Sequence, residues 1–508
     1  MKPKITFIIL LTALFSFSCN DNDKNLSLSS EKDLLSFSFS KELNSGAHIK
    51  QGIEARVSTD EIIVFIPENV DKTHLIASFE FKGSSIWVHS TKQESGVTAN
   101  DFTQPITYVI RAEDGSTKEY HVKVLTSPDA ATGYGIPHVF IYTNGKAPIN
   151  SKEDYINGYM VIDGNGTFED YQGVMKIRGR GNTSWHFPKK PYKIKLDEGA
   201  PLFGLYAHRK WILLANWRIG NLLGNAIPYK MAHLLGMPFT NHMIPVVVTI
   251  NGKFMGFYDF TEQKEVGTGR IDIGEDGVLL ELDYEMDEDW QFWTSSKLFS
   301  LPVMIQNPEV EDSAEFNQIK NKFKHLLRLI DSTTFPNNNY LDYFDDVAFV
   351  NYMLVYLFTD NEEINHLKST YINKKPGGKY RMGIIWDFDS GYGFVGNRTH
   401  FKINTATTPL FWPGKEAGLG TVFFERLMED PHLITLLKEK WKWFKTDKYR
   451  KLRDYVIQYA GQTKKVFNRE HLIWGKRGSS GDWQKDLQEV LLWMDVRVKY
   501  MDSYLAGL

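Results

Sequence analysis

The sequence predicts the α+β fold class, with a small all-β, Ig-like sandwich placed before a larger mixed domain. Residues 31–126 carry short segments of alternating polar and apolar side chains, separated by turn residues, which is typical of a β-sandwich. Residues 136–508 mix strand-like and helix-like patterns without a fixed repeat. The length of 508 residues accommodates about two to four domains, which agrees with this division.

The overall composition excludes several classes of protein. The 59 Lys and Arg residues are balanced by 62 Asp and Glu residues, and the net charge of −3 lacks the cationic excess typical of nucleic-acid-binding proteins. Beyond the N-terminus there is no apolar run of about 18 residues, which argues against a protein with several membrane spans. A single cysteine excludes a disulfide-stabilised scaffold and a cysteine-based zinc site.

The N-terminus predicts export and lipidation. Residues 1–18 have the form of a lipoprotein signal peptide, in which two lysines precede the apolar run Ile5–Phe15. The only cysteine, Cys19, follows directly, and this stretch resembles a bacterial lipobox; an ordinary signal peptide with a chance cysteine is the alternative. Residues 19–30 then form a polar tether. We expect a lipid anchor on Cys19 that holds the chain in the cell envelope, on the periplasmic or the outer face of the outer membrane.

Four strands are predicted in the N-terminal sandwich: Glu61–Pro67, Thr73–Phe81, Ile106–Arg111 and Lys118–Val124. The last two flank a connection that contains Asp114-Gly115, a strong signal for a β-hairpin. No cluster of catalytic residue types occurs here, so we interpret residues 31–126 as a spacer or assembly module. Residues 127–135, with one proline and two glycines, are the predicted linker.

A basic, glycine-rich hairpin lies near the start of the larger domain. A predicted strand runs from Met175 into Arg178-Gly179-Arg180-Gly181, and a second strand returns through Tyr192–Leu196. The glycines allow the backbone to approach a ligand closely, and exposed N–H groups in such a loop can hold an anion. Seven Lys and Arg residues between Lys176 and Lys195 give the positive field that a triphosphate needs. A solvated basic hairpin is the alternative interpretation.

Two further stretches are mainly structural. Lys210–Trp217 is a predicted strand that runs into a helical pattern over Asn221–Leu235. Val246–Glu262 is a predicted hairpin, because Asn251-Gly252 is typical of a two-residue type I′ turn. Glu262 ends the second strand, where a carboxylate can hold a basic partner or contact a base, although a solvated charge is the alternative.

The most specific pattern is acidic. A predicted helix, Val347–Phe358, is followed by Asp360 and Asn361, and Asp387 and Asp389 come directly after an apolar strand. Mg²⁺ in phosphoryl-transfer sites takes one or two carboxylates together with the phosphates of the substrate, so this cluster can assemble a magnesium site. Asp387 and Asp389 lie two residues apart and would face the same side of an extended chain. A structural turn is the alternative.

Taken together, these stretches resemble the CotH-type spore-coat protein kinase family, an atypical branch of the protein-kinase-like fold. The resemblance extends over nearly all of residues 136–508 and implies a two-lobed, kinase-like domain. Its markers are Arg178–Trp185, Lys189–Tyr192, Gly256–Tyr258 with Glu262, Trp386–Asp389, Asn468-Arg469, Trp474, Trp493 and Arg497. Ile219 and Gly224 stand where the family commonly has an acidic residue and an arginine. The sandwich at residues 31–126 resembles modules at the front of surface lipoproteins of Bacteroides-type bacteria.

The resemblance also implies roles for the acidic residues. Asp387 would bind Mg²⁺, with Asp389 and Asn361 as further metal ligands. Asp360 would orient the acceptor hydroxyl, with Glu362 or Glu363 as alternatives if the register of the loop differs.

The nucleotide, ATP, would be held by basic residues in this reading. Lys190 or Lys193 would reach its phosphates, and Arg178 and Arg180 would line the entrance of the same nucleotide site. Glu262 would lie where the β-lobe passes into the helical lobe.

Two functions follow as hypotheses. The first is a Mg²⁺- and ATP-dependent kinase that phosphorylates Ser or Thr of envelope or surface proteins, is attached to the membrane through Cys19 and binds no nucleic acid. The second is a catalytically inactive surface lipoprotein that binds a protein or glycan partner, with Trp290–Trp293 and Phe411–Pro413 as aromatic surfaces. The presence of both acidic groups favours the enzyme.

Overall fold

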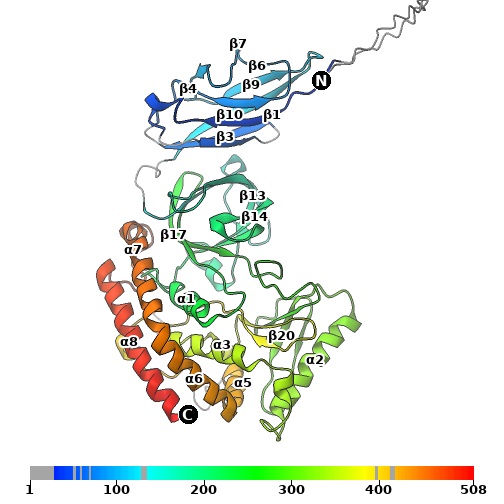
Figure 1. The fold of residues 1–508 in the computed structure, drawn as a ribbon, viewed down its shortest axis with the longest axis vertical. Coiled ribbons are helices and arrows are strands. Elements are labelled where there is room, and N and C mark those ends of the chain that lie inside the picture. Colours follow the sequence, from blue (N-terminus) through cyan, green and yellow to red (C-terminus); the bar gives the residue numbers. More distant parts are fainter. Residues whose placement is uncertain are drawn as a thin grey trace, which may run out of the picture. The chain divides into compact units, whose positions relative to one another are not determined.

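The computed structural model describes residues 28–49, 53–57, 60–67, 70–127, 134–394, 399–411 and 418–508. They form two compact units, one ending at Thr126 and one beginning at Ser127 (Figure 1). The predicted signal peptide and Cys19 lie outside the described residues, as do most of the predicted tether and linker. No helix in the described part of the chain combines the length and apolarity needed to span a membrane.

The N-terminal unit is all-β and Ig-like, as predicted. Its main sheet has the order β5-β1-β2-β3-β10-β9-β6-β7, and β4 pairs with β8. The strands are β1 (Leu34–Phe39), β2 (Ile53–Val57), β3 (Glu61–Pro67), β4 (Leu75–Ile76), β5 (Ser78–Phe81), β6 (Ser85–Val88), β7 (Thr91–Lys92), β8 (Ala99–Asn100), β9 (Ile106–Arg111) and β10 (Thr117–Ser127). One apolar core contains residues of β1, β3, β5, β6, β9 and β10.

Most predicted strands of this unit are confirmed. The segments Glu61–Pro67 and Ile106–Arg111 are β3 and β9, and β9 pairs with β10 in the hairpin that Asp114-Gly115 indicated. The predicted strand Thr73–Phe81 is wrong as one strand, because it is divided between β4 and β5. The reason is that its two halves pair with different partners, β4 with β8 and β5 with β1.

The larger unit begins with a closed barrel of seven strands in the order β11-β12-β13-β14-β15-β17-β16. The strands are β11 (His138–Thr143), β12 (Ile156–Asp163), β13 (Tyr171–Gly179), β14 (Tyr192–Ala200), β15 (His208–Leu214), β16 (Ile244–Ile250) and β17 (Lys253–Glu262). Apolar side chains such as Trp211, Tyr258 and Phe260 are fully buried in its core. The turn Asn251-Gly252 between β16 and β17 has φ angles of 51° and 81°, as the predicted type I′ turn requires.

The rest of this unit is helical, with one further sheet of order β19-β20-β18-β21-β22. Its strands are β18 (Val278–Leu282), β19 (Gln291–Trp293), β20 (Pro302–Asn307), β21 (Thr370–Lys374) and β22 (Arg381–Met382). The helices are α1 (Ala226–Leu235), α2 (Ser313–Asp331), α3 (Asp346–Thr359), α4 (Glu363–His366), α5 (Leu419–Met428), α6 (Pro431–Asp447), α7 (Tyr449–Trp474) and α8 (Trp483–Gly507). Figure 1 shows α7 and α8 side by side, with α7 reaching the barrel strand β17.

The two predicted helices of this unit are found, with one shift of boundary. The predicted helix Val347–Phe358 is α3, which is apolar all round and buried along nearly its whole length. The predicted helix Asn221–Leu235 begins only at Ala226. Before it, the side chain of Asn221 accepts a hydrogen bond from the backbone N–H of Leu223, and Leu222 has a φ of 66°, so residues 221–225 form a turn instead.

Candidate functional site

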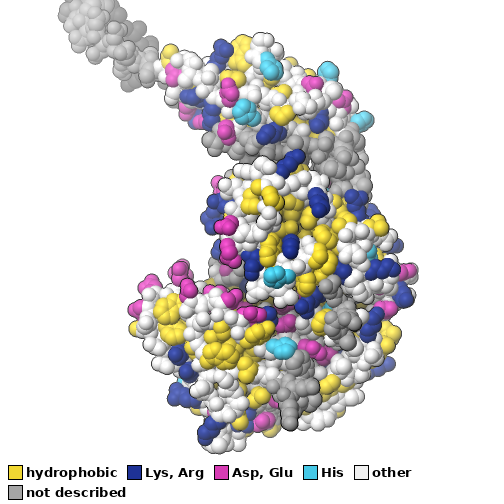
Figure 2. Space-filling model, turned by 180° about the vertical axis from the view of Figure 1, so that it is seen from behind, with side chains coloured by type: hydrophobic (Ala, Val, Ile, Leu, Met, Phe, Trp, Pro, Cys, Tyr) yellow, Lys and Arg dark blue, Asp and Glu magenta, His cyan; other side chains and the backbone are white. Residues whose placement is uncertain are grey.

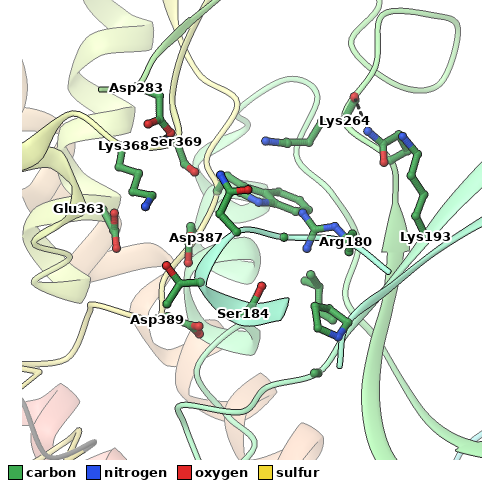
Figure 3. Close-up of a pocket in the computed structure, with 18 of the residues that line it drawn as sticks. Arg180, Ser184, Lys193, Lys264, Asp283, Glu363, Lys368, Ser369, Asp387 and Asp389 are labelled. Atoms are coloured by element: carbon green, nitrogen blue, oxygen red, sulfur yellow. Dashed lines mark hydrogen bonds between the residues drawn. The ribbon is translucent and has the colours of Figure 1, made fainter. Parts of the chain in front are cut away.

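A pocket of about 560 Å³ lies within the larger unit, between the barrel, the five-stranded sheet and the segment after α3 (Figure 3). The residues that line it include Arg178–Ser184, Lys193, Leu214–Arg218, Lys264, Glu281, Asp283, Glu363, Lys368, Tyr371 and Trp386–Asp389. Basic side chains come mainly from the barrel, and acidic side chains come from the sheet and the loops below it. Figure 2 shows acidic side chains gathered in a band across this unit, beneath the barrel.

The barrel side of the pocket carries three of the predicted basic residues. Arg178 on β13 and Lys193 on β14 are directly opposite each other in the antiparallel register. Arg180 follows β13, and its guanidinium lies 5.7 Å from the ring of Trp386. Burial first, and then the charge of Arg178, lower the pKa of Lys193 to about 8. Arg178, Arg180 and Lys193 thus form a concentration of positive charge that favours an anionic ligand.

The glycine-rich loop is closely packed onto itself. Gly181 has a φ of +83°, and a Cβ placed on it would lie 2.1 Å from Oγ of Ser184. Only glycine fits at this position, because any other side chain would displace the serine that lines the pocket.

The opposite side of the pocket is acidic, and three of its carboxylates lie near the end of α3. Asp387 and Asp389 line it as predicted, together with Glu363 from the start of α4 (Figure 3). Burial and the nearby charge of Asp387 raise the pKa of Asp389 to about 7 and that of Glu363 to about 8. Ser390 donates a hydrogen bond of 2.7 Å to the Glu363 carboxylate. Such crowding of negative charge is the arrangement that a bound cation relieves.

The donor chemistry of this cluster fits Mg²⁺. Among the residues that the structure describes, no group of three or more His, Cys or acidic side chains is arranged to enclose a metal ion alone. Magnesium sites in phosphoryl-transfer proteins do not need one, because one or two carboxylates act together with waters and substrate phosphates. Asp387 and Asp389 are two carboxylates of this kind, and both line the pocket. Asn361 lies behind them, because its side-chain amide donates a 2.8 Å hydrogen bond to the backbone carbonyl of Asp387.

Asp360 does not line the pocket. Only 1% of its surface is exposed, and its carboxylate accepts a 2.9 Å hydrogen bond from the guanidinium of buried Arg497 and another from Thr408. It also ends α3 in a left-handed conformation, with a φ of 51°. Of the two alternatives that the sequence left open, Glu363 lines the pocket and Glu362 does not.

Lys190 and Glu262 also lie outside the pocket lining. The amine of Lys190 donates to the carbonyl oxygen of Trp185 and lies 5.1 Å from the centre of its ring. The carboxylate of Glu262 accepts hydrogen bonds from the backbone N–H of His242 at 2.8 Å and from its ring at 2.7 Å. Both residues are therefore engaged in local structure.

Several residues of the pocket had no signal in the sequence. They are Arg218, Lys264, Glu281, Asp283, Lys368 and Tyr371. Each is a single charged or aromatic residue in an ordinary strand or loop. Glu281 and Tyr371 meet because they are direct partners in the pairing of β18 with β21, which joins segments 90 residues apart.

Other markers of the family resemblance form a buried ionic network outside the pocket. The amine of Lys189 lies 2.7 Å from the carboxylate of Glu470 on α7, which also pairs with Arg477 at 2.7 Å. Arg477 donates a 2.7 Å hydrogen bond to the carbonyl oxygen of Asn216, which lines the pocket. A Cβ on Gly256 would lie 2.1 Å from Glu470, so glycine is required there. This network fixes the barrel against α7.

Ile219 and Gly224, the two positions that depart from the family pattern, pack against each other in an apolar environment. Ile219 is 4% exposed, and a Cβ on Gly224 would lie 2.3 Å from its terminal carbon. The two residues are complementary, because the isoleucine side chain occupies the space that a side chain at 224 would need.

The aromatic segments named for the binding hypothesis are partly described. In Trp290–Trp293, Phe292 is 5% exposed and packs in the core, whereas Trp293 is 48% exposed. Phe411 packs against the core, and Trp412 lies outside the described residues.

Comparison with protein families gives two matches. A model described as CotH kinase protein matches residues 177–501, which is more than half of the chain. A model described as SGBP, N-terminal, matches residues 35–124. No curated protein matches the chain.

Solved structures give weak similarity. A Bacteroides fragilis protein proposed to be secreted is 16% identical, covers 19% of this chain and 95% of its own, and has a TM-score of 0.14. A Bacteroides thetaiotaomicron protein proposed to be a glycoside hydrolase is 14% identical, covers 58% of this chain and 89% of its own, and has a TM-score of 0.20.

Proposed function

This chain belongs to the CotH kinase family, and on that premise we propose that it is an extracytoplasmic protein kinase with a two-lobed, kinase-like larger domain. Its reaction is transfer of the terminal phosphoryl group of ATP to a serine or threonine hydroxyl of an envelope or surface protein. The observation that supports this most directly is the polarity of the pocket. Basic residues from the barrel face the carboxylates Asp387, Asp389 and Glu363 across one cavity.

The basic side of the pocket binds and orients the phosphates of ATP in this proposal. Arg178, Arg180 and Lys193 neutralise the charge of the phosphates, and the backbone N–H groups of the glycine-rich loop add donors. Asp387 and Asp389 would hold Mg²⁺, which when bound supplies further charge neutralisation to the phosphates. Asn361 holds the backbone of Asp387 in place through its 2.8 Å hydrogen bond.

We assign orientation of the acceptor to Glu363. Its carboxylate lines the pocket, and the 2.7 Å hydrogen bond from Ser390 fixes its direction. The acceptor hydroxyl oxygen forms a bond to the terminal phosphorus of ATP, the bond from that phosphorus to the bridging oxygen breaks, and ADP leaves. The hydroxyl proton passes to the Glu363 carboxylate.

The protein substrate and the location are also part of the proposal. The SGBP-type N-terminal domain at residues 35–124 supports a protein at the surface of a Bacteroides-type cell. The lipobox-like sequence at Cys19 supports a lipid anchor on the same chain. The kinase domain would then meet substrates that are themselves in the envelope or at the surface.

A second candidate function is an inactive scaffold that binds a surface partner. It is favoured by Trp293, whose side chain is 48% exposed, since an exposed indole is a common stacking surface for a sugar or a peptide. This candidate requires no nucleotide binding.

Calorimetry with Mg²⁺ and ATP separates the two candidates. We expect the wild-type chain to bind ATP only in the presence of Mg²⁺, and Asp387→Ala to lose that binding. Asp276→Ala is the matched control, because Asp276 is exposed and lies outside the pocket lining. No binding by folded wild-type protein at millimolar ATP would refute the kinase and leave the binding function.

A further inference from the structure

Lys264 is a basic residue of the pocket that no motif singled out. It lies two residues beyond the end of β17, and 17% of its side chain is exposed. Its amine lies 4.2 Å from the ring centre of Tyr371 and 5.0 Å from that of Trp386, and it donates a hydrogen bond to the Tyr371 hydroxyl. The amine therefore lies beside two aromatic rings, and Figure 3 shows the side chain of Lys264 extending into the pocket.

The hydrogen-bonding capacity of this amine is not used up by its neighbours. An ammonium group has three N–H donors, and among the described residues the Tyr371 hydroxyl is its one hydrogen-bond acceptor. The nearest carboxylate oxygen, on Glu281, is 4.0 Å away and accepts a hydrogen bond from the same Tyr371 hydroxyl. Burial lowers the pKa of Lys264 and raises that of Glu281 to about 7. A partly desolvated amine with unused donors favours an anionic ligand.

The position of Lys264 relative to the proposed metal ligand indicates which anion. Two cations lie near the ring of Trp386: the guanidinium of Arg180 is 5.7 Å from its centre and the amine of Lys264 is 5.0 Å from it. The next residue is Asp387, whose charge acts on both cations. A phosphate chain beside Asp387 is therefore within the field of Arg180 and Lys264 together.

We propose that Lys264 binds the phosphate chain of the nucleoside triphosphate, and that Tyr371 and Glu281 are positioning residues that hold its amine toward the pocket. This inference rests on the proposed phosphoryl-transfer function and adds a substrate-binding residue to it. Lys264 enters from the segment after β17, whereas Arg178, Arg180 and Lys193 come from the β13–β14 hairpin. The phosphate chain would thus be held by cations from two separate elements.

The test uses the full chain and three probes measured by calorimetry: Mg²⁺ with ATP, Mg²⁺ with inorganic tripolyphosphate, and adenosine without phosphate. Lys264→Met keeps the aliphatic stem and removes the charge. Lys230→Met is the matched control, because Lys230 on α1 also has its amine over a ring, 4.7 Å from that of Tyr455, but lies outside the pocket lining. Lys264→Arg and Tyr371→Phe test the charge and its positioning separately.

We expect Lys264→Met to lower the affinity for both polyphosphates about tenfold or more, because a charge-assisted contact is lost, and to leave the affinity for adenosine unchanged. The affinity of Lys264→Arg for both polyphosphates should stay within about threefold of wild type, because the charge is kept. Tyr371→Phe should lower this affinity about threefold, and Lys230→Met should leave it unchanged. Thermal unfolding confirms that each variant is folded. If Lys264→Met is unfolded, the Tyr371→Phe variant tests the inference: a loss of affinity of about threefold for both polyphosphates supports it, and an unchanged affinity overturns it.

The outcomes separate this inference from the proposed function. The inference is overturned if the wild type binds both polyphosphates and folded Lys264→Met binds them with the same affinity. The proposed kinase function would then remain intact. An equal loss for adenosine and for the polyphosphates also overturns it, since it would place Lys264 at the base. Failure of the wild type to bind either polyphosphate overturns the proposed function together with the inference.

Discussion

Replacement of Asp387 by asparagine should make the ligand-free protein more stable while it abolishes binding of Mg²⁺ and ATP. Asp387 has a φ of 54°, in the left-handed region that asparagine also adopts readily, so the substitution removes the charge with little change in the backbone. The charge acts on Asp389 and Glu363, in both of which it is the largest cause of a raised pKa after burial.

The size of the gain follows from those pKa values. A pKa of about 7 for Asp389, against an ordinary value of 3.8, corresponds to about 4 kcal/mol of destabilisation when the group is ionised, and Glu363 at about 8 corresponds to a similar figure. Burial is the first cause of each shift and the charge of Asp387 is the second. The part due to Asp387, discounted for screening and for the lost attraction of Asp387 to Arg180 and Lys264, is on the order of 1 kcal/mol.

The gain in stability of Asp387→Asn should depend on pH. Asp389 and Glu363 have folded-state pKa values raised above their unfolded ones, so their penalty is absent below the unfolded pKa near 4 and fully present above about pH 8. The gain in Asp387→Asn should therefore be seen at pH 8.5 and nearly vanish at pH 5. Scanning calorimetry without added metal measures this gain as a rise of roughly 1–2 °C per kcal/mol in the unfolding temperature of the larger unit, which spans residues 127–508.

A fall in the unfolding temperature of Asp387→Asn at pH 8.5 would refute this reasoning, and so would an equal rise at pH 5 and pH 8.5. Asp276→Asn is the control, because this exposed aspartate lies outside the pocket lining and should change neither value. In the wild type, added Mg²⁺ should raise the unfolding temperature at pH 8.5, and Asp387→Asn should respond less.

Three further predictions concern stability. His138 is buried and its pKa is lowered to about 3, so below about pH 6.5 the unfolded chain binds a proton that the folded chain does not bind. The contribution of His138 to stability should therefore fall by about 2 kcal/mol between pH 7 and pH 5, and urea titration measures it as the difference between the wild type and His138→Phe at the two pH values. Asp360→Asn leaves the buried Arg497 guanidinium without its carboxylate and should cost about 3–5 kcal/mol in urea unfolding, with the affinity of the folded fraction for ATP retained; a selective loss of affinity would contradict this. Gly256→Ala forces a Cβ against Glu470 and should destabilise by about 2 kcal/mol, whereas Gly461→Ala, at an open position in α7, should stabilise by about 0.5–1 kcal/mol; a similar effect of both would be inconsistent with the packing.

Local sequence patterns predicted local structure well in this chain. The type I′ turn at Asn251-Gly252, the helix α3 and the strands β3 and β9 follow from turn chemistry and apolar periodicity, which act over a few residues. The closed barrel does not, because it depends on the parallel pairing of β11 with β16, where His138 lies opposite Val247. No local pattern specifies a partner at that distance in the chain.

The candidate site divides in the same way. Arg180 and Asp387 were found because each belongs to a distinctive motif, and both line the pocket. The prediction that Asp387 and Asp389 face the same side rested on an extended chain, but Asp387 is left-handed, so the alternation of a strand is not what brings them together. Lys264 was missed because its surroundings are created by strand pairing and not by its own neighbours in sequence.

In the proposed kinase, the present contacts of each carboxylate favour Glu363 over Asp360 as the acceptor-orienting acid. A group that receives a proton from the acceptor must have an oxygen that faces the substrate and loses little when it becomes neutral. Protonation of Asp360 would remove the partner of a fully buried guanidinium, that of Arg497, which is unfavourable in the protein interior. Burial and repulsion from Asp387 both disfavour the charged form of Glu363 and raise its pKa to about 8, so protonation of Glu363 relieves both. The same kind of chemistry can therefore be performed by a glutamate three residues later in the chain, one whose longer side chain reaches the pocket from the start of α4.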